Sequence, residues 1–229
     1  MLAKKKKLSK KEIQEDKLVT TFYEAKSFYD ENQTIIFSVI GGLALLIVAV
    51  LFYTSKVEEN NKLASTELAR VYESYNAGLY QQAIDGKPGT QEIGLKKIVD
   101  EYGGSEQGEV ARILLANSYF YTEQYDKAFD EFDNYSGSDD IMIASALAGK
   151  ASCYEVDGKY EEAAKYFSKA ANVTKSVPAN PTYLLNASIN YIKIGNNNEA
   201  KIMLNKIKSD YKASPVSRKV DKYLAQIKG

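Results

Sequence analysis

The pattern of apolar and polar residues divides the chain into three parts, and the middle part is the most distinctive. Residues 35–53 form an uncharged run of nineteen residues, thirteen of which are Ile, Leu, Val or Phe. As a helix with a rise of about 1.5 Å per residue, this run is roughly 28 Å long, close to the thickness of a bilayer's hydrocarbon core. The buried helix of a soluble protein would normally keep a polar stripe. The run therefore predicts a transmembrane helix.

Residues 1–34 form a leader with a helical pattern of its own. Ser9 and Glu12 have the spacing of a capping box. Leu18, Phe22, Ala25 and Tyr29 recur at helical spacing and make one apolar face. We expect a short amphipathic helix that either lies on membrane lipid at the cytoplasmic interface or docks on a protein partner. Both alternatives stay open at this point.

Lysine and arginine are distributed unequally around the apolar run. Eight lysines precede it, including the Lys4–Lys7 run, whereas Lys56, Lys62 and Arg70 follow it in a comparable stretch. The positive-inside rule predicts a cytoplasmic N-terminus and an exported domain over residues 54–229. Because 34 residues precede the run and no small-residue cleavage pattern follows it, we expect a retained signal anchor at 35–53.

The exported part contains a recurring helical phrase. GKYEEAAKYFSKA at 158–170 is matched by EQYDKAFDEFDNY at 123–135 and GNNNEAKIMLNKI at 195–207, and a weaker first copy contains Gly94, Ile98 and Glu101. Each copy carries one small residue on the apolar face, with intervals of 34, 35 and 37 residues. These small residues are Gly94, Ala128, Ala163 and Ala200.

A partner helix precedes each copy and is marked by small or apolar residues followed by a tyrosine. The marks are Leu68-Ala69 with Tyr72, Leu115-Ala116 with Tyr119, Ala151 with Tyr154, and Ser188 with Tyr191. The tyrosine intervals are 47, 35 and 37 residues. We therefore expect about 13 extra residues in the first pair, within the stretch GLYQQAIDGKPGTQ.

This pattern resembles the tetratricopeptide repeat (TPR), a helix–turn–helix unit of about 34 residues. A small residue lets two helices approach closely, and Ala163 is expected at such a contact, with Tyr160 and Phe167 beside it. A single repeat cannot bury its apolar face, so repeats stack into a solenoid. The sequence thus predicts an all-α fold. A single N-terminal transmembrane helix is followed by a TPR-like α-solenoid of about four helix pairs over residues 62–212, with a last helix near 215–228.

Composition limits the chemistry of the chain. It has no histidine and one cysteine, so the usual zinc sites, the Ser-His-Asp triad and an intramolecular disulfide are excluded. Cys153 is expected to be a small buried apolar residue. The exported part has 22 basic and 24 acidic residues, which gives no basic face for nucleic acid. We expect no enzyme activity, no cofactor and no metal.

The layout of the whole chain resembles the YfgM-type ancillary subunit of the bacterial SecYEG translocon. The leader carries Phe28, Tyr29, Glu31 and Asn32 before the single span, and the exported repeat domain has the appropriate size. The resemblance implies an inner-membrane protein with a periplasmic repeat domain. It also implies three kinds of partner, namely the SecYEG translocon, a membrane-anchored periplasmic chaperone of the peptidyl-prolyl isomerase type, and exported client proteins. The alternative is a periplasmic TPR scaffold for another envelope complex, such as cell division or outer-membrane assembly.

A partner-binding groove is expected on the first helix of each repeat, because that helix lines the concave surface of TPR solenoids. The candidate residues flank the Leu-Ala/Tyr packing face. They are Asn117, Phe120 and Tyr121 in the second repeat, Ser152 and Glu155 in the third, and Ile189, Ile192 and Lys193 in the fourth. Phe120, Ile189 and Ile192 are apolar, which favours a protein partner. The alternative is that these three pack on the next repeat or under the C-terminal helix.

Overall fold

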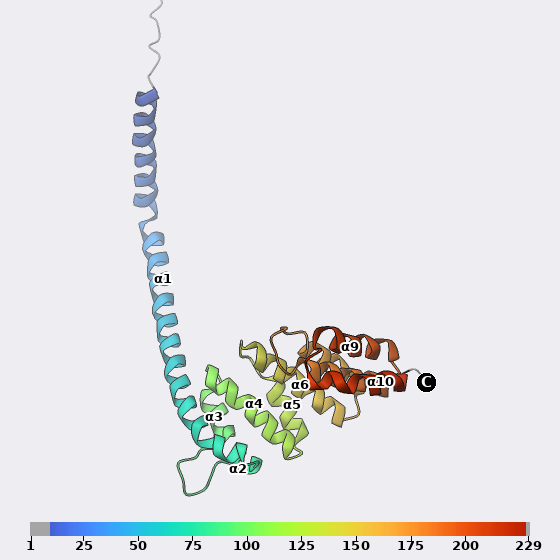
Figure 1. Ribbon diagram of the computed structural model, residues 1–229. Coiled ribbons are helices and arrows are strands. Elements are labelled where there is room, and N and C mark those ends of the chain that lie inside the picture. Colours follow the sequence, from blue (N-terminus) through green and yellow to red (C-terminus); the bar gives the residue numbers. More distant parts are fainter. Residues whose placement is uncertain (1–9, 228–229) are drawn as a thin grey trace, which may run out of the picture. The chain divides into compact units, whose positions relative to one another are not determined.

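The computed structural model of the chain describes residues 10–227, with side chains from residue 17 onward (Figure 1). Within this range every regular element is a helix, apart from one isolated antiparallel bridge between Gly86 and Ile93. The chain divides into two compact units, the first ending at Lys56 and the second beginning at Val57. The long helix α1 (Lys10–Asn76) contributes to both units.

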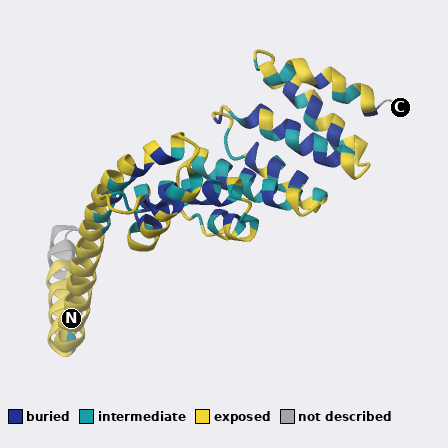
Figure 2. Ribbon diagram, turned by 90° about the horizontal axis from the view of Figure 1, so that it is seen from below, coloured by how far each residue is buried: buried dark blue, intermediate teal, exposed yellow. Residues whose placement is uncertain are grey.

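The first unit consists of the N-terminal part of α1. Its large apolar residues are exposed, for example Phe37 at 59%, Leu46 at 60% and Phe52 at 75%, and Figure 2 shows this part of the helix as exposed along most of its length. Nothing in the described protein covers this surface, and the helix is long and apolar enough to cross a membrane. The expected capping box at Ser9 and Glu12, and the Lys4–Lys7 run, lie outside the described side chains.

The second unit is an α-solenoid of antiparallel helices in which each helix packs against its neighbours in the chain. The C-terminal part of α1 shares a hydrophobic cluster with α2 (Tyr80–Asp85) and α3 (Leu95–Tyr102). The later pairs are α4 (Glu106–Tyr121) with α5 (Tyr125–Asp133), α6 (Asp140–Val156) with α7 (Tyr160–Ala170), and α8 (Asn180–Lys193) with α9 (Asn197–Asp210). A short 3-10 helix η1 (Pro215–Lys219) leads into α10 (Val220–Ile227), which packs on α8 and α9.

The small residues predicted for the second helix of each later pair lie at the contacts between helices. Ala128, Ala163 and Ala200 are each 0% exposed. Ala163 shares a hydrophobic cluster with Phe167 and with residues of α6 and α8. Because a methyl side chain lets two helix backbones approach, larger side chains such as Phe167 fill the space beside it. The prediction of a close helix contact at Ala163 is confirmed.

Four turns of one kind join the two helices of each pair. Each turn contains a residue with positive φ, between 61° and 75°, and these residues are Gly78, Glu123, Gly158 and Gly195. The N–H that follows it donates to a carbonyl five positions back, for example from Gln124 to Tyr119 at 2.8 Å and from Lys159 to Tyr154 at 2.9 Å. This is the hydrogen bond of a Schellman helix end, in which glycine carries no steric penalty.

These turns also correct the register predicted for the first pair. The turn at Gly78 places Ser74, not Tyr72, at the position of Tyr119, because the N–H of Leu79 donates to the Ser74 carbonyl at 3.0 Å. Tyr72 is 39% exposed and Ala69 is also exposed. Of the three residues predicted to form the packing face of this helix, Leu68 is therefore correct, and Ala69 and Tyr72 are wrong. Its place is taken by Ala64, Leu68, Val71 and Ser74, all buried. The interval from Ser74 to Tyr119 is 45 residues, so the insertion is about two residues shorter than predicted.

The insertion interrupts the second helix of the first pair and fills the space that a tyrosine occupies in the other pairs. It follows α2, whose buried Ala83 lies five residues after Gly78, as Ala128 lies five residues after Glu123. The prediction of Gly94 as the small residue of the first copy is therefore wrong, because Gly94 ends the insertion and precedes α3. The Ser74 hydroxyl donates to the Glu92 carboxylate and accepts from Gln82, both at 2.6 Å. A side chain at Gly94 would collide with the Ile84 carbonyl. Serine therefore replaces the tyrosine at this position because its hydroxyl bonds with residues of α2 and of the inserted loop.

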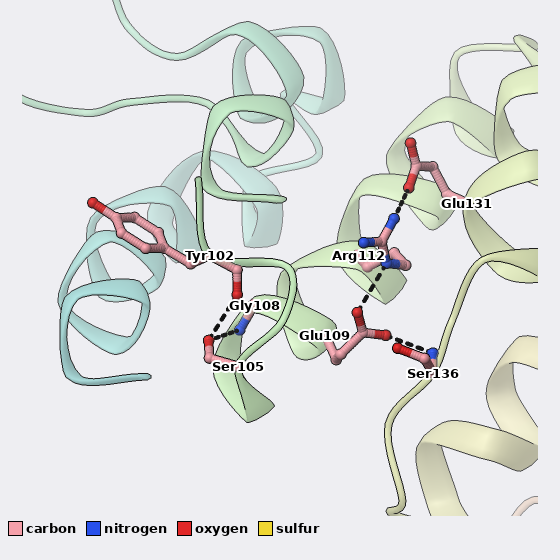
Figure 3. A network of polar contacts seen from close by, with 7 residues as sticks. All are labelled: Tyr102, Ser105, Gly108, Glu109, Arg112, Glu131 and Ser136. Atoms are coloured by element: carbon pink, nitrogen blue, oxygen red, sulfur yellow. Dashed lines mark hydrogen bonds and ion pairs between the residues drawn. The ribbon is translucent and has the colours of Figure 1, made fainter. Parts of the chain in front are cut away.

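A polar network joins α4, α5 and the segment that follows α5 (Figure 3). Glu109 on α4 is 5% exposed, and its carboxylate accepts from Arg112 at 3.2 Å and from the Ser136 N–H at 2.7 Å. Arg112 also donates to Glu131 on α5 at 2.8 Å. Burial raises the pKa of Glu131, against the opposing effect of the Arg112 charge. The guanidinium thus joins two carboxylates that would otherwise be costly to bury.

The start of α4 has its own cap in the same region. The Ser105 hydroxyl accepts from the Gly108 N–H at 3.1 Å and donates to the Tyr102 carbonyl at 2.8 Å (Figure 3). Such a cap satisfies one of the free N–H groups at a helix start. It also ties the end of α3 to the start of α4, so the first and second pairs keep a defined geometry.

Candidate partner-binding surface

An open cleft of about 880 Å³ lies between the second and third helix pairs. It is formed by the turn before α5, one face of α5, the last turn of α6 and the turn that follows α6. The lining residues are Glu123, Gln124, Tyr125, Asp126, Lys127, Phe129, Asp130, Cys153, Tyr154, Val156, Asp157 and Lys159. We refer to this feature as the cleft. Its volume is sufficient for several side chains of a bound peptide.

Aromatic and aliphatic side chains provide the apolar part of the cleft. The rings of Phe129 and Tyr154 meet edge to face with centroids 5.1 Å apart. Val156 is 50% exposed, so an apolar side chain is available to a partner. Cys153 is 6% exposed, and burial raises the pKa of its thiol to about 11. A thiol protonated at neutral pH is a packing group and a poor nucleophile.

The charged residues of the cleft are predominantly acidic. Lys159 is paired with Asp157 at 2.6 Å, and Lys127 donates to Gln124 at 2.7 Å. Glu123, Asp126 and Asp130 make no ion pair within the part of the chain that the structure describes. A cleft with an apolar floor and unpaired carboxylates suits a segment that combines apolar and basic side chains.

A strip of aromatic rings continues from the cleft onto the first pair. It consists of Tyr75, Tyr80, Tyr121, Phe120 and Tyr125, which we call the aromatic strip. The centroid distances along it are 5.7 Å for Tyr75–Tyr80, 4.6 Å for Tyr80–Tyr121, 6.2 Å for Tyr121–Phe120 and 5.2 Å for Phe120–Tyr125. Because Tyr125 also lines the cleft, strip and cleft form one continuous surface.

The three candidate residues of the second repeat belong to this surface. Tyr121 is 59% exposed and stacks on Tyr80. Phe120 is half-buried and packs against the core as well as against Tyr125. Asn117 is half-buried and forms a hydrogen bond with Tyr75. Burial raises the pKa of Tyr75, and this hydrogen bond opposes the shift. These residues therefore combine packing with exposure to solvent.

The candidates of the third repeat, and Lys193 of the fourth, form mostly internal contacts. The Ser152 hydroxyl donates to the Ala148 carbonyl at 3.0 Å within α6. Glu155 pairs with Lys193 at 2.7 Å and so joins α6 to α8. The Lys193 ammonium also lies 4.4 Å from the centroid of the Tyr160 ring. Glu155 does not line the cleft, although its neighbours in sequence Tyr154 and Val156 do.

The two isoleucines of the fourth repeat lie apart from the cleft. Ile189 and Ile192 are half-buried and pack against the hydrophobic cluster of α8, α9 and α10, which includes Leu204 and Val220. Neither residue lines the cleft. The structure thus brings Phe120 and Tyr121 of α4 to the aromatic strip, joins Glu155 to Lys193 on α8, and packs Ile189 and Ile192 against the cluster of α8, α9 and α10.

Sequence reasoning assigned two residues of the cleft, Tyr125 and Tyr154, to helix packing alone. Both are half-buried and present part of each ring to the cleft. A signal was present in the segment EQYDKAFDEF, where Tyr125 and Phe129 are four residues apart, as are Asp126 and Asp130. Residues four apart share a helix face. This pattern predicts neighbouring aromatic and acidic rows, although it does not place α6 opposite them.

Comparison with known proteins gives the fold of the chain. No protein-family model and no curated protein matches it. Among solved structures it is similar to the crystal structure of a protein described as a kinesin light chain of Podospora anserina with nearly identical TPR-like repeats. The two are 14% identical with a TM-score of 0.52, over 76% of this chain and 85% of the other. At this identity the likeness concerns the fold alone. The second unit is a TPR-like α-solenoid.

The side chains of the described range give no sign of a metal centre. Between residues 17 and 227 no three His, Cys, Asp or Glu side chains are grouped as metal ligands would be. The carboxylates of the cleft are spread along α5 and the flanking turns rather than converging on a point.

Proposed function

We propose that this protein is a membrane-anchored interaction module beside the SecYEG translocon. Its apolar helix at 35–53 anchors it in a bacterial inner membrane, and its TPR-like unit faces the periplasm. There it links the translocon to a membrane-anchored chaperone of the peptidyl-prolyl isomerase type and takes part in the handling of exported proteins. The observation that carries the proposal is the direct attachment of a wholly exposed apolar helix to a TPR-like solenoid.

The cleft and the aromatic strip are the proposed docking site for the partner. Exposed Tyr121 and Val156 offer apolar contact, while Glu123, Asp126 and Asp130 offer charge for basic side chains. Aromatic side chains are enriched at protein interfaces because they bury a large area at a small cost in conformational entropy. Newly exported segments are themselves unfolded and expose apolar side chains, so they suit the same surface.

Topology is tested by proteolysis of spheroplasts. Eight lysines precede the span and only Lys56, Lys62 and Arg70 follow it in a comparable stretch, so protease added from outside should digest residues 54–229 and spare the leader. Detergent lysis before proteolysis is the control, since both parts should then be cut. Protection of the repeat unit in intact spheroplasts would reverse the orientation and rule out the translocon assignment as stated.

Partner capture is tested with exposed residues, so that the fold is preserved. The variant Tyr121→Ser with Val156→Ser removes two apolar side chains that are 59% and 50% exposed. The matched control is Ile202→Ser on α9, which is 54% exposed and lies outside the cleft. After mild solubilisation of membranes, the control should co-isolate with SecY and the chaperone as the wild type does. The amount of SecY and chaperone that co-isolates with the double variant should be at least about tenfold lower.

The outcome also separates this proposal from its alternative. Phe120→Ser with Ile192→Ser is a second, more severe variant, whose fold must be checked by circular dichroism because both residues are half-buried. Normal co-isolation of both double variants, with the fold intact, would exclude the cleft as the docking site. Co-isolation of cell-division or outer-membrane assembly proteins in place of SecY would favour the periplasmic scaffold instead.

A further inference from the structure

The leader part of α1, residues 17–31, has a continuous apolar face that no part of the described protein covers. Leu18, Phe22 and Tyr29 are 71%, 64% and 42% exposed, and Ala25 lies between them on the same face. With about 100° of rotation per residue, these four positions fall within a narrow arc of the helix. A face of this kind normally contacts either lipid or another protein.

The opposite face of the same segment is mostly polar and makes its own contacts. Glu24, Ser27 and Glu31 fall opposite the apolar arc at the same helical rotation, and exposed Tyr23 lies beside them. The Ser27 hydroxyl donates to the Glu31 carboxylate at 3.1 Å. Lys26 lies at the edge between the two faces, where its ammonium can reach anionic head groups while its stem covers apolar surface. This distribution is that of an interfacial helix.

A break in helical geometry separates the leader from the apolar span. Asn32 has φ −117° and ψ 17°, outside the helical region. Its side-chain amide donates to the Phe28 carbonyl at 2.8 Å, the acceptor that the N–H of residue 32 would use in an unbroken helix. The helix axis can therefore change direction at Asn32 while the Phe28 carbonyl keeps a partner. The break lies three residues before the span begins at Ile35.

We propose that the leader helix lies in the head-group region of the membrane, with its apolar face against the acyl chains, and that Asn32 is the bend between it and the span. This inference rests on the membrane anchoring proposed above. The Tyr29 ring meets the Phe37 ring of the span edge to face at 6.5 Å, so the apolar face continues across the break. Lipid is the occupant because the span holds this face at the membrane surface, where the effective concentration of lipid far exceeds that of any protein.

The absence of tryptophan from the chain permits a direct test. Single-tryptophan variants of the full-length protein are reconstituted into vesicles of phosphatidylcholine and phosphatidylglycerol whose acyl chains carry bromine near the head groups, and the variant at position 46, near the middle of the span, is reconstituted into matching vesicles with bromine near the chain ends. Phe22→Trp reports the apolar face, Ser27→Trp is the matched control on the polar face, and Leu46→Trp reports the span. Bromine quenches tryptophan fluorescence only at close approach.

The inference predicts that Phe22→Trp is quenched at least roughly twofold more than Ser27→Trp, since an interfacial helix buries its apolar face about 5–10 Å deep. Tyr29→Trp, on the same face, should behave as Phe22→Trp does. Equal, weak quenching at positions 22, 27 and 29 together with strong quenching at position 46 would overturn the inference, leave the anchor intact and assign the apolar face to a protein partner. Weak quenching at position 46 would instead refute the membrane anchor, and the inference with it.

Discussion

Replacing Ala163 with leucine tests the helix contact on which the repeat architecture depends. Ala163 is 0% exposed on α7, and its cluster includes Phe167 at 2%, with Ala170 and Ala187 at 0%. Leucine adds three heavy atoms where no space remains, so α7 must move away from its neighbours. Overpacking of this kind costs about 1–3 kcal/mol. Helix propensity contributes little, because leucine is nearly as good a helix former as alanine.

The assay is thermal unfolding of the full-length protein in detergent, followed by circular dichroism. For a unit of this size, each kcal/mol lowers Tm by about 2–4 °C, so we expect a decrease of about 3–10 °C. Ala69→Leu is the matched control, because it makes the same change at an exposed position within α1. It should leave Tm within about 1 °C. An unchanged Tm for Ala163→Leu, or an equal loss for both variants, would refute the packing described here.

Further predictions concern charge, pH and backbone strain. Arg112→Met should lower the free energy of unfolding in urea by about 1–3 kcal/mol, because it leaves the buried Glu109 carboxylate without its cation; a change below about 0.5 kcal/mol would contradict this. Folding raises the pKa of Cys153 from 9.0 to about 11 and that of Tyr135 from 10.0 to about 12. The contribution of both protonated groups to the free energy of unfolding is therefore complete below pH 9 and should fall as the pH rises toward 12. In Cys153→Ala, the free energy of unfolding measured in urea should fall less steeply with pH over this range. Iodoacetamide at pH 8 should label native Cys153 about a hundredfold more slowly than the unfolded chain. Glu123→Gly should raise stability by about 0.5–1 kcal/mol, because Glu123 alone of the four turn residues is not glycine at positive φ; calorimetry showing a lower Tm would exclude this.

The candidate surface was only partly within reach of sequence reasoning. Asn117, Phe120 and Tyr121 could be found because their face of α4 follows from helical spacing, and the structure brings them to the aromatic strip. Glu155 and Lys193 were placed on separate repeats, and their ion pair at 2.7 Å depends on how α6 and α8 stack. Helical period determines which way a side chain points and leaves open what lies opposite it.

The first helix pair shows a second limit of periodicity. Tyr72 matches the repeat spacing approximately, but the turn at Gly78 makes Ser74 the equivalent of Tyr119. The prediction was wrong because the insertion shifts the repeat register of the first pair. Counting residues along the chain does not show where the inserted residues begin, so it does not show which residue is equivalent to Tyr119. The hydrogen bonds of Ser74 with Glu92 and Gln82 explain the missing aromatic residue, and they exist only once the loop has folded back on α1.

The features that depend on local spacing follow directly from the order of residues along the chain. These are the uncharged span at 35–53, the lysine excess before it, and the helix contacts at Ala128, Ala163 and Ala200, since each follows from composition or from the 3.6-residue helical period. The cleft, the aromatic strip and the bend at Asn32 are visible only in the folded protein. They arise from contacts between elements distant in the chain, or from backbone angles that a helix-forming sequence does not reveal. The fold is encoded in repeats, whereas the surface it presents is created where one repeat meets the next.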